Sequence, residues 1–429
     1  MRTSRRLVLA ALLASAASVQ EVPRPDGGEP DPRTWVSATW EKLDSRDVAG
    51  RHMLMDIARD YGLYEAMRAL AQEILAVDPD HREAHRHLNH TLHQGKWLAP
   101  EEAEAAGLLK FDYTYPPEYR TPDKDRLLLP LYLSRRDHRE HERRQEWASH
   151  WVIQRKPLTL RSNCTREKAE RFADTFREFA LHVTQFLGIP LKSNYEINIY
   201  RSQEEYHTVG GAPRGTGGYY APGLRKLFFY DDPRDQISTY RVLFHEGTHM
   251  IVHLTCKNKD FHYPICINEG LAEYMGAARW DYYAERFTFG HPLNDRIQHF
   301  KTLLRANRAK PLLELVLHDR RGFGASEYAQ AWALVTYLSD TQVGHSPKQL
   351  GVYLGRLFSD NRYKMLPDAD PRKRDEMQRI FEKTFFNARN GTTWEEFQQR
   401  FWEYAAALKE EVGAPDFSRR YRLRAGLGS

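Results

Sequence analysis

Cysteine is scarce in this chain, which has only three cysteines among its 429 residues. They are Cys164, Cys256 and Cys266, and no Cys-x-x-Cys pair occurs, so neither a thiolate zinc site nor a redox motif is indicated. A Gly-x-Ser-x-Gly elbow and a glycine-rich phosphate loop are also missing, so a serine hydrolase and a phosphate-loop enzyme lack support. Beyond the N-terminus, no apolar run approaches the ~20 residues that a membrane-spanning helix needs.

The first 18 residues predict a secretory signal peptide. A basic region with Arg2, Arg5 and Arg6 precedes a short apolar run, and residues 14–16 offer a small-residue cleavage site. A twin-arginine signal is a second interpretation of the same segment. We therefore expect an exported protein, periplasmic or extracellular. Without the three arginines the formal net charge falls from +5 to +2, so we expect no nucleic-acid partner.

Export also bears on the cysteines, because an oxidising compartment permits a disulfide. Cys256 and Cys266 are close enough in the sequence to bridge a loop, which would leave Cys164 free. Buried thiols account equally well for the same three residues, so both interpretations stay open.

Residues 244–250 read Phe-His-Glu-Gly-Thr-His-Met and carry the clearest chemical signal in the chain. His245 and His249 are four residues apart, so on a helix they project from one face, about 6 Å apart along the axis. Two neutral imidazoles in this arrangement can bind one tetrahedral zinc ion. Glu246 is offset around the helix, so it can act as a general base on a metal-bound water without binding the metal itself.

The third ligand determines the type of site. A longer signature, with a glycine and then a third histidine, is absent because Val252 and Thr255 hold those places. His253 lies on the same helix face but roughly 12 Å from His245 along the axis, so one ion cannot contact both, and we expect His253 to be a neighbouring group. Glu269, in the sequence Asn-Glu-Gly-Leu-Ala-Glu-Tyr, is the better candidate, because a second helix beginning there could return past the first.

His-Glu-x-x-His, followed at this distance by Asn-Glu-Gly-Leu-Ala-Glu-Tyr, resembles the gluzincin clan of zinc metallopeptidases, which includes thermolysin and the membrane-alanyl-aminopeptidase type. The likeness is closest to a family of uncharacterised bacterial gluzincin-like domains and covers roughly residues 195–340. It implies that His245, His249 and Glu269 bind one zinc ion per chain. It also implies that Glu246 is the general base.

The same resemblance implies supporting roles for other residues. Glu273, one turn after the third ligand, matches the carboxylate that orients a ligand histidine, and such imidazoles commonly donate their second N–H to a carboxylate. Tyr328 resembles a downstream tyrosine that steadies the oxyanion in the aminopeptidase branch; a core tyrosine at the start of an amphipathic helix is an equal alternative. Gly217, Gly218 and Tyr219 lie where the clan has its substrate-binding edge strand.

Around this motif the sequence predicts an α+β protein, in which a small mixed sheet and the active-site helices are flanked by helical regions. The expected parts are a linker at 19–33, a helical domain at 34–110 with one tetratricopeptide-like hairpin, a connecting segment at 111–156, the catalytic core at 157–290 and a helical C-terminal subdomain at 291–429 that completes the site. A single hairpin cannot form a repeat array, so a small domain packed on the core is favoured, while a protein partner for these helices stays open.

Local patterns near the motif also predict individual elements. They are strands at 157–161, 195–200, 215–220 and 226–230, a helix at 166–186 capped by Thr165, a helix from residue 238, and mostly helices beyond residue 280.

The function that these features predict is a secreted zinc-dependent peptidase acting on a peptide or protein substrate. A zinc-bound water, activated by Glu246, would attack the peptide carbonyl. The Gly-x-Met-Glu-Asn sequence, which holds a free amino terminus in the aminopeptidase branch, does not occur here, and this favours an endopeptidase. Three alternatives stay open: an inactive scaffold whose helical region binds a partner, a hydrolase acting on something other than protein, and a helix whose histidines bind nothing.

Overall fold

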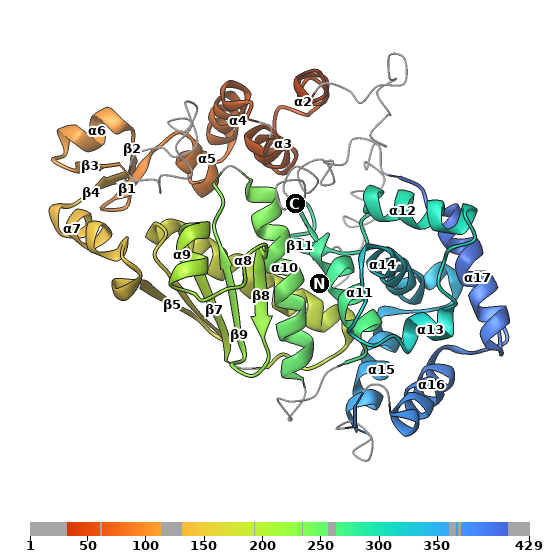
Figure 1. The fold of residues 1–429 in the computed structure, drawn as a ribbon. Helices are drawn as coiled ribbons and strands as arrows, with labels where there is room; N and C mark the ends of the chain where they lie inside the picture. The colour runs from red at the N-terminus through yellow and green to blue at the C-terminus, as the bar shows by residue number, and fades with distance from the viewer. Residues whose placement is uncertain are drawn as a thin grey trace, which may run out of the picture.

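The computed structural model describes residues 32–60, 62–112, 131–192, 194–233, 235–255, 263–359, 366–367 and 370–410. It shows a mixed structure of helices and small sheets, so the predicted α+β class is confirmed (Figure 1). The predicted signal peptide and most of the predicted linker lie outside these ranges. Across the ranges that are described, none of the helices combines the length and apolarity needed to cross a membrane.

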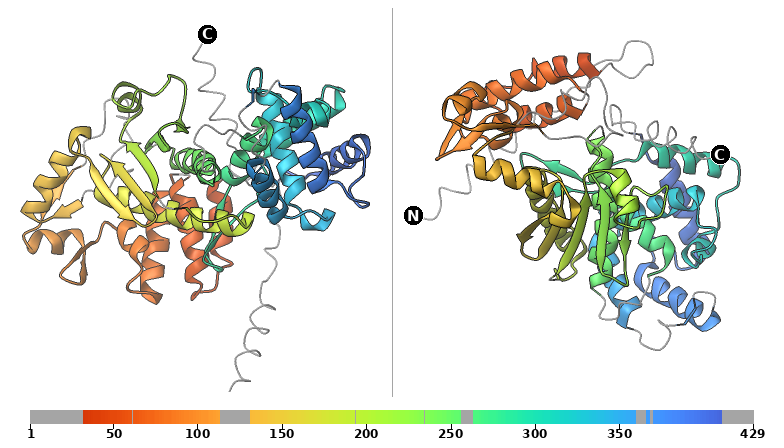
Figure 2. Two further views of the ribbon diagram at one scale, coloured as in Figure 1. Left: turned by 90° about the horizontal axis from the view of Figure 1, so that it is seen from below. Right: turned by 60° about the vertical axis from the view of Figure 1, so that its left-hand side comes forward.

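The N-terminal part is a small helical unit with a core of its own. Its helices are α2 (Pro32–Trp40), α3 (Val48–Asp60), α4 (Tyr64–Val77) and α5 (Arg82–His87). Buried apolar side chains, Leu54 and Leu70 among them, form a cluster separate from the main core. The unit lies along one side of the rest of the molecule (Figure 2), and the hydroxyl of Tyr282 donates a hydrogen bond to Asp56 across this boundary.

Short strands interrupt the helical pattern that we predicted for residues 34–110. β1 (Thr91–His93) and β2 (Lys96–Leu98) form a hairpin, in which Gln94 and Gly95 have φ angles of 49° and 82°. Positive φ at both central residues is typical of a type I′ turn, so Gln-Gly is the local signal that the helical interpretation missed. The elements that follow are α6 (Pro100–Ala105), β3 (Leu109–Phe111), β4 (Leu131–Leu133), α7 (Arg135–Arg144) and the 3₁₀ helix η3 (Trp147–Ser149).

A five-stranded sheet is the frame of the main part, in the order β5-β6-β7-β9-β8. Its strands are β5 (Trp151–Arg155), β6 (Leu158–Ser162), β7 (Tyr195–Tyr200), β8 (Gly218–Ala221) and β9 (Lys226–Tyr230). The central strands β6, β7 and β9 are parallel, whereas β5 and β8 pair antiparallel at the two edges. Four predicted strands are therefore present, and β5 adds a fifth within the segment that we predicted as a connection.

The helix α8 (Arg166–Leu187) confirms the prediction for residues 166–186. The hydroxyl of Thr165 accepts a hydrogen bond from the backbone N–H of Lys168, and Gly188, with φ of 66°, ends the helix in the left-handed conformation. A Cβ added at Gly247 would lie 2.4 Å from the ring of Phe176, so α8 and the motif-bearing helix approach closely there.

The motif-bearing helix α10 (Gln236–Leu254) and its neighbour α11 (Ile265–Gly276) lie between the sheet and the C-terminal helices (Figure 1). A hairpin of β10 (Arg279–Asp281) and β11 (Arg286–Thr288) then precedes a region that is mainly helical, as predicted. Its elements are α12 (Asn294–Arg305), α13 (Leu312–Val316), α14 (Ala325–Ser339), η4 (Thr341–Val343), α15 (Pro347–Ser359), α16 (Pro371–Phe385) and α17 (Trp394–Ala407).

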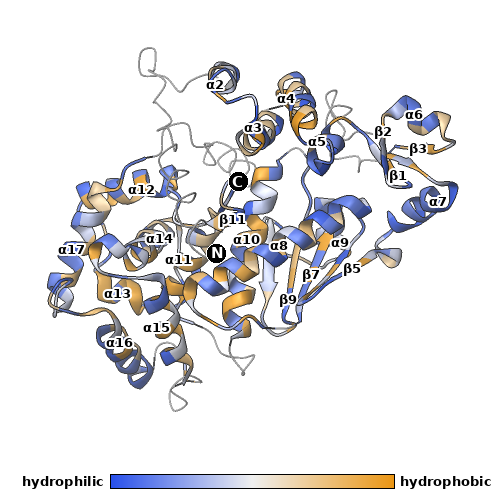
Figure 3. Ribbon diagram, turned by 180° about the vertical axis from the view of Figure 1, so that it is seen from behind, coloured by the Kyte–Doolittle hydropathy of each residue, from blue (hydrophilic) through white to orange (hydrophobic). Residues whose placement is uncertain are grey.

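One hydrophobic core joins the sheet and the C-terminal helices. Its buried side chains run from Trp151 to Ala405 in the sequence, so the catalytic core and the C-terminal region that we predicted as separate parts share a single interior. Figure 3 shows the contrast between elements: α7 is hydrophilic along its length, whereas α10 and α11 carry many hydrophobic residues.

Two of the three cysteines lie in the described part of the chain. Cys164 and Cys266 are buried free thiols, and burial raises the pKa of each thiol above its usual range. The alternative of a disulfide between Cys256 and Cys266 involves Cys256, which lies outside the described residues.

Candidate metal centre

Two antiparallel helices bring the predicted ligands together. α10 begins where the side chain of Asp235 accepts a hydrogen bond from the backbone N–H of Ser238, and its next turns carry the two histidines. α11 runs antiparallel to α10. His245 lies close to both Glu269 and Glu273 of α11, whereas His249, one turn later, lies close only to Glu269. A Cβ added at Gly276 would lie 3.5 Å from the Cβ of His245, so the two backbones run close together.

His245, His249 and Glu269 form the one group of side chains among the described residues that could hold a metal ion. The Oε2 atom of Glu269 lies 3.5 Å from Nε2 of His245 and 3.4 Å from Nε2 of His249, and all three ligand atoms are within 4.8 Å of one another. Tetrahedral zinc with bonds of ~2.0–2.1 Å separates its ligands by about 3.4 Å. Two imidazoles and one carboxylate at these separations therefore fit zinc.

Electrostatic interactions also couple these three side chains. Burial disfavours charge on His249, but the carboxylates of Glu269 and Glu246 outweigh it and raise the pKa of this imidazole to about 9. Burial likewise disfavours charge on Glu269, yet His249 and His245 hold the pKa of its carboxyl well below the usual range. Because metal ligation requires a neutral imidazole, a bound metal takes the place of this proton.

Glu273 lies behind His245, on the side away from the other ligands. Its Oε1 atom is 3.5 Å from Nδ1 of His245, and its Oε2 atom is 2.9 Å from Nε of Arg296 and 3.3 Å from a terminal nitrogen of Arg241. Although burial alone would raise the pKa of Glu273, Arg296 and Arg241 lower it to about 2. A carboxylate fixed in this way can orient the imidazole so that Nε2 faces the metal position.

Glu246 stands beside the three ligands without joining them. Its Oε2 atom accepts a hydrogen bond of 2.8 Å from the backbone N–H of Tyr220, in the edge strand β8. The carboxylate is therefore held between the candidate ligands and the edge strand β8, which is the position that a base acting on a water would need.

The three residues predicted to bind substrate lie at this edge, but the two glycines and Tyr219 pack against different neighbours. A Cβ added at Gly218 would lie 2.5 Å from Cγ1 of Val242, and one added at Gly217 would lie 3.4 Å from Cγ2, so both glycines allow close packing on α10. The ring of Tyr219 stacks on Phe228, with centroids 5.0 Å apart, in a cluster separate from the main core.

Tyr328, at the start of α14, lies on the other side of the centre. Burial raises the pKa of its hydroxyl, and the negative charge of Glu269 adds to this effect. The hydroxyl is thus close to the third ligand, although Tyr328 is 59 positions further along the chain than Glu269.

Sequence reasoning missed Tyr220, Arg241 and Arg296. Arg241 precedes His245 by one helical turn, so the same helix-face argument that joined the histidines could have found it. Nothing local marked Tyr220 or Arg296, because each reaches the centre from a separate element. His253 is not part of the candidate ligand group, and its Nδ1 atom lies 2.8 Å from the hydroxyl of Tyr220.

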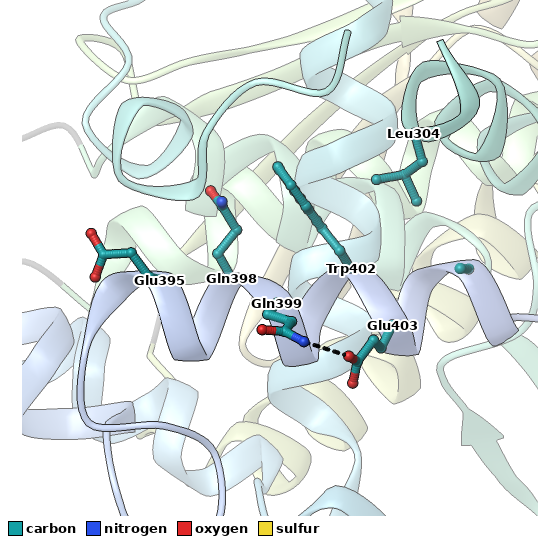
Figure 4. A pocket seen from close by; sticks show the side chains of 7 residues that line it. Leu304, Glu395, Gln398, Gln399, Trp402 and Glu403 are labelled. Atoms are coloured by element: carbon teal, nitrogen blue, oxygen red, sulfur yellow. Dashed lines mark hydrogen bonds between the residues drawn. The ribbon is translucent and has the colours of Figure 1, made fainter. Parts of the chain in front are cut away.

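A separate hollow of about 530 Å³ lies between α12 and α17 (Figure 4). Its lining residues are Leu304, Glu395, Gln398, Gln399, Trp402, Glu403 and Ala406. It shares no residue with the metal centre.

Comparison with known families adds one finding about the site. A family model described as a protein of unknown function (DUF1570) matches residues 236–350. The matched segment begins with α10 and includes α11 and α14, so it holds the three ligand residues, Glu246 and Tyr328, but not the edge strand β8. No curated protein matches the chain.

Proposed function

We propose that this protein is an exported zinc-dependent peptidase of the gluzincin type, with Glu246 as its general base. The observation that carries the proposal is the separation of the ligand atoms, 3.4 and 3.5 Å, in a chain that places a carboxylate beside them without adding it to the ligand set. A site that only stored a metal would have no use for this fourth group.

The chemistry follows from the positions of the residues. When bound, zinc would supply Lewis acidity and a water of lowered pKa. Glu246 would accept a proton from the water that attacks the peptide carbonyl, and would then deliver this proton to the leaving nitrogen. In this proposal, Glu273 keeps the imidazole of His245 in one orientation, and the hydroxyl of Tyr328, which lies close to Glu269, donates a hydrogen bond to the developing oxyanion.

The substrate in this proposal is an extended peptide or protein segment. The outer edge of β8, which pairs with no other strand in the described part of the chain, offers backbone groups to which such a segment can pair. The backbone N–H of Tyr220 points from this edge to Glu246. The absence of the Gly-x-Met-Glu-Asn sequence favours cleavage within a chain over removal of its first residue.

The first experiment measures zinc per chain in the purified mature protein by elemental mass spectrometry. We expect close to one zinc in the wild type and a clear loss in Glu269→Ala. Glu178→Ala is the matched control, because Glu178 pairs with Arg177 on the surface of α8 and should leave the zinc content unchanged. Wild-type protein without zinc, even after reconstitution, would reject the metal site and favour a scaffold.

The second experiment tests the base with a peptide library. Glu246→Gln should keep its zinc and lose nearly all turnover, at least ~100-fold, because the amide cannot accept the proton. Glu178→Gln should cleave as the wild type does. Full activity in Glu246→Gln would refute the role of Glu246, whereas zinc binding with no peptide cleavage in the wild type would point to a different substrate.

A further inference from the structure

Tyr220, in the edge strand β8, contacts α10 through both its backbone and its side chain. Its backbone N–H donates to Oε2 of Glu246 at 2.8 Å, and its hydroxyl lies 2.8 Å from Nδ1 of His253. The second contact is buried, since Tyr220 is 8% exposed and His253 is 7% exposed. The chemistry proposed above uses neither His253 nor this hydroxyl.

The two contacts are spread along the helix. Glu246 and His253 are seven residues apart, about 10 Å along the axis. A single hydrogen bond would let the strand rotate relative to the helix. Two hydrogen bonds at different positions along the helix axis fix both the distance and the orientation of the strand relative to the helix. The strand also packs directly on the helix one turn before Glu246, where a Cβ on Gly218 would come within 2.5 Å of Val242.

We propose that Tyr220 is a positioning residue that clamps the edge strand β8 to α10 and holds the Glu246 carboxylate in its working position. His253 is the anchor of the clamp. The catalytic consequence of the clamp rests on the proposed peptidase function, but the clamp itself is a property of the fold and can be measured without any substrate.

The clamp matters because proton transfer depends steeply on distance. A general base has to lie within about 2.6–3.2 Å of the atom from which it takes the proton, and a misplacement of about 1 Å can cost about 100-fold in rate. The same strand edge is where the proposed substrate pairs. Loosening it therefore displaces the base and the substrate together, while the ligands on α10 and α11 keep their places.

Hydrogen–deuterium exchange of the full-length mature protein tests the clamp directly. In Tyr220→Phe, we expect peptides that cover β8 to exchange at least about threefold faster, because a buried bond that restrains the strand is lost, while β9 stays unchanged. Tyr195→Phe is the control: the buried hydroxyl of Tyr195 accepts a hydrogen bond of 3.3 Å from the backbone N–H of Lys192 and is not bonded to α10. Unchanged exchange of β8 in Tyr220→Phe, or equal acceleration in the control, would overturn the proposal.

Turnover of a library-derived peptide provides the second readout. Tyr220→Phe and His253→Leu should each lower kcat by about tenfold with KM within about twofold, and the double variant should be no worse than either single one, because both remove the same bond. His253→Asn places an amide near the position of Nδ1 and should restore kcat. Zinc content should stay at the wild-type value in every variant.

The outcomes separate the clamp from the peptidase. If β8 loosens in Tyr220→Phe but the wild type cleaves no peptide, the proposed function fails and the clamp stands. If β8 keeps its exchange rate, or if zinc is lost together with the hydroxyl, the clamp fails whatever the activity. Losses that multiply in the double variant, or a His253→Asn variant as slow as His253→Leu, also reject it.

Discussion

The contact between α11 and α14 gives the most demanding prediction, which concerns Gly270→Ala. A Cβ at this position would lie 2.5 Å from the backbone oxygen of Ala331 and 2.8 Å from Cγ2 of Val335. A backbone oxygen cannot turn aside as a side chain can, so the two helices have to move apart by about 1 Å to restore ordinary contact. Because Gly270 follows Glu269 directly, this movement would displace Glu269, the proposed third ligand.

The magnitude follows from two opposing effects. Alanine gains about 1 kcal/mol over glycine within a helix, whereas overpacking costs typically about 1–3 kcal/mol and occasionally more. Because the clash is with a backbone oxygen, we place the overpacking cost in the upper part of this range, at about 2–3 kcal/mol. We therefore expect Gly270→Ala to be destabilised by about 1–2 kcal/mol without metal, which lowers Tm by roughly 2–8 °C in a unit of this size. We also expect zinc affinity to fall about tenfold, as it does when groups that support a ligand are disturbed.

Thermal unfolding followed by circular dichroism, in a chelator, measures the first effect, and competition with a chromogenic chelator measures the second. Gly276→Ala is the matched control on the same helix, because its Cβ would meet His245 at 3.5 Å, an ordinary contact. It should be at least as stable as the wild type, because alanine is favoured over glycine in a helix and meets no clash here. A Gly270→Ala protein that melts at or above the wild-type temperature, or a control that loses as much, would refute the reasoning.

Two further predictions concern ionisable side chains. Glu273→Gln should weaken zinc binding by about 10–100-fold and lower Tm without metal, because the charged partner of Arg296 is lost; unchanged values in chelator competition and thermal unfolding would contradict this. His345 is 2% exposed, and burial lowers its pKa to about 4, despite the opposing charge of Asp340 and with a smaller contribution from Arg389. Its neutral form therefore stabilises the fold fully above pH 6.5, and about 3 kcal/mol of the free energy of unfolding should be lost as the pH falls from 6.5 to 4. Urea unfolding at several pH values should show a weaker pH dependence in His345→Phe, and identical profiles would contradict the assignment.

The elements near the site could be predicted well because their signals are local. The strand β7, the capping residue of α8 and the helical pattern of α10 each depend on neighbours in the chain, and the structure confirms all three. The alternation in β7 predicts a half-buried strand, whereas this central strand is buried on both faces. The β1–β2 hairpin was missed because a Gln-Gly turn competes with a strongly helical context. The edge strand β5 was missed because it lies at the end of the segment 111–156, which we predicted as a connection.

The spacing of His245 and His249 also belongs to local structure, since any α-helix places residues four apart on one face. Sequence reasoning could therefore propose two ligands and a base before any fold was known. It could nominate Glu269 as the third ligand only by assuming that a second helix returns past the first. The distance of 3.4 Å from Glu269 to His249 depends on how closely α10 and α11 pack.

The remaining supporting groups reach the centre from other elements. Arg296 comes from α12, Tyr328 from α14 and Tyr220 from the far edge of the sheet. No periodicity relates these residues to the motif, because their proximity is produced by the shared core that runs from β5 to α17. A helix can specify the relation between residues one turn apart, but contacts between residues distant in the chain exist only once the hydrophobic core has brought the elements together.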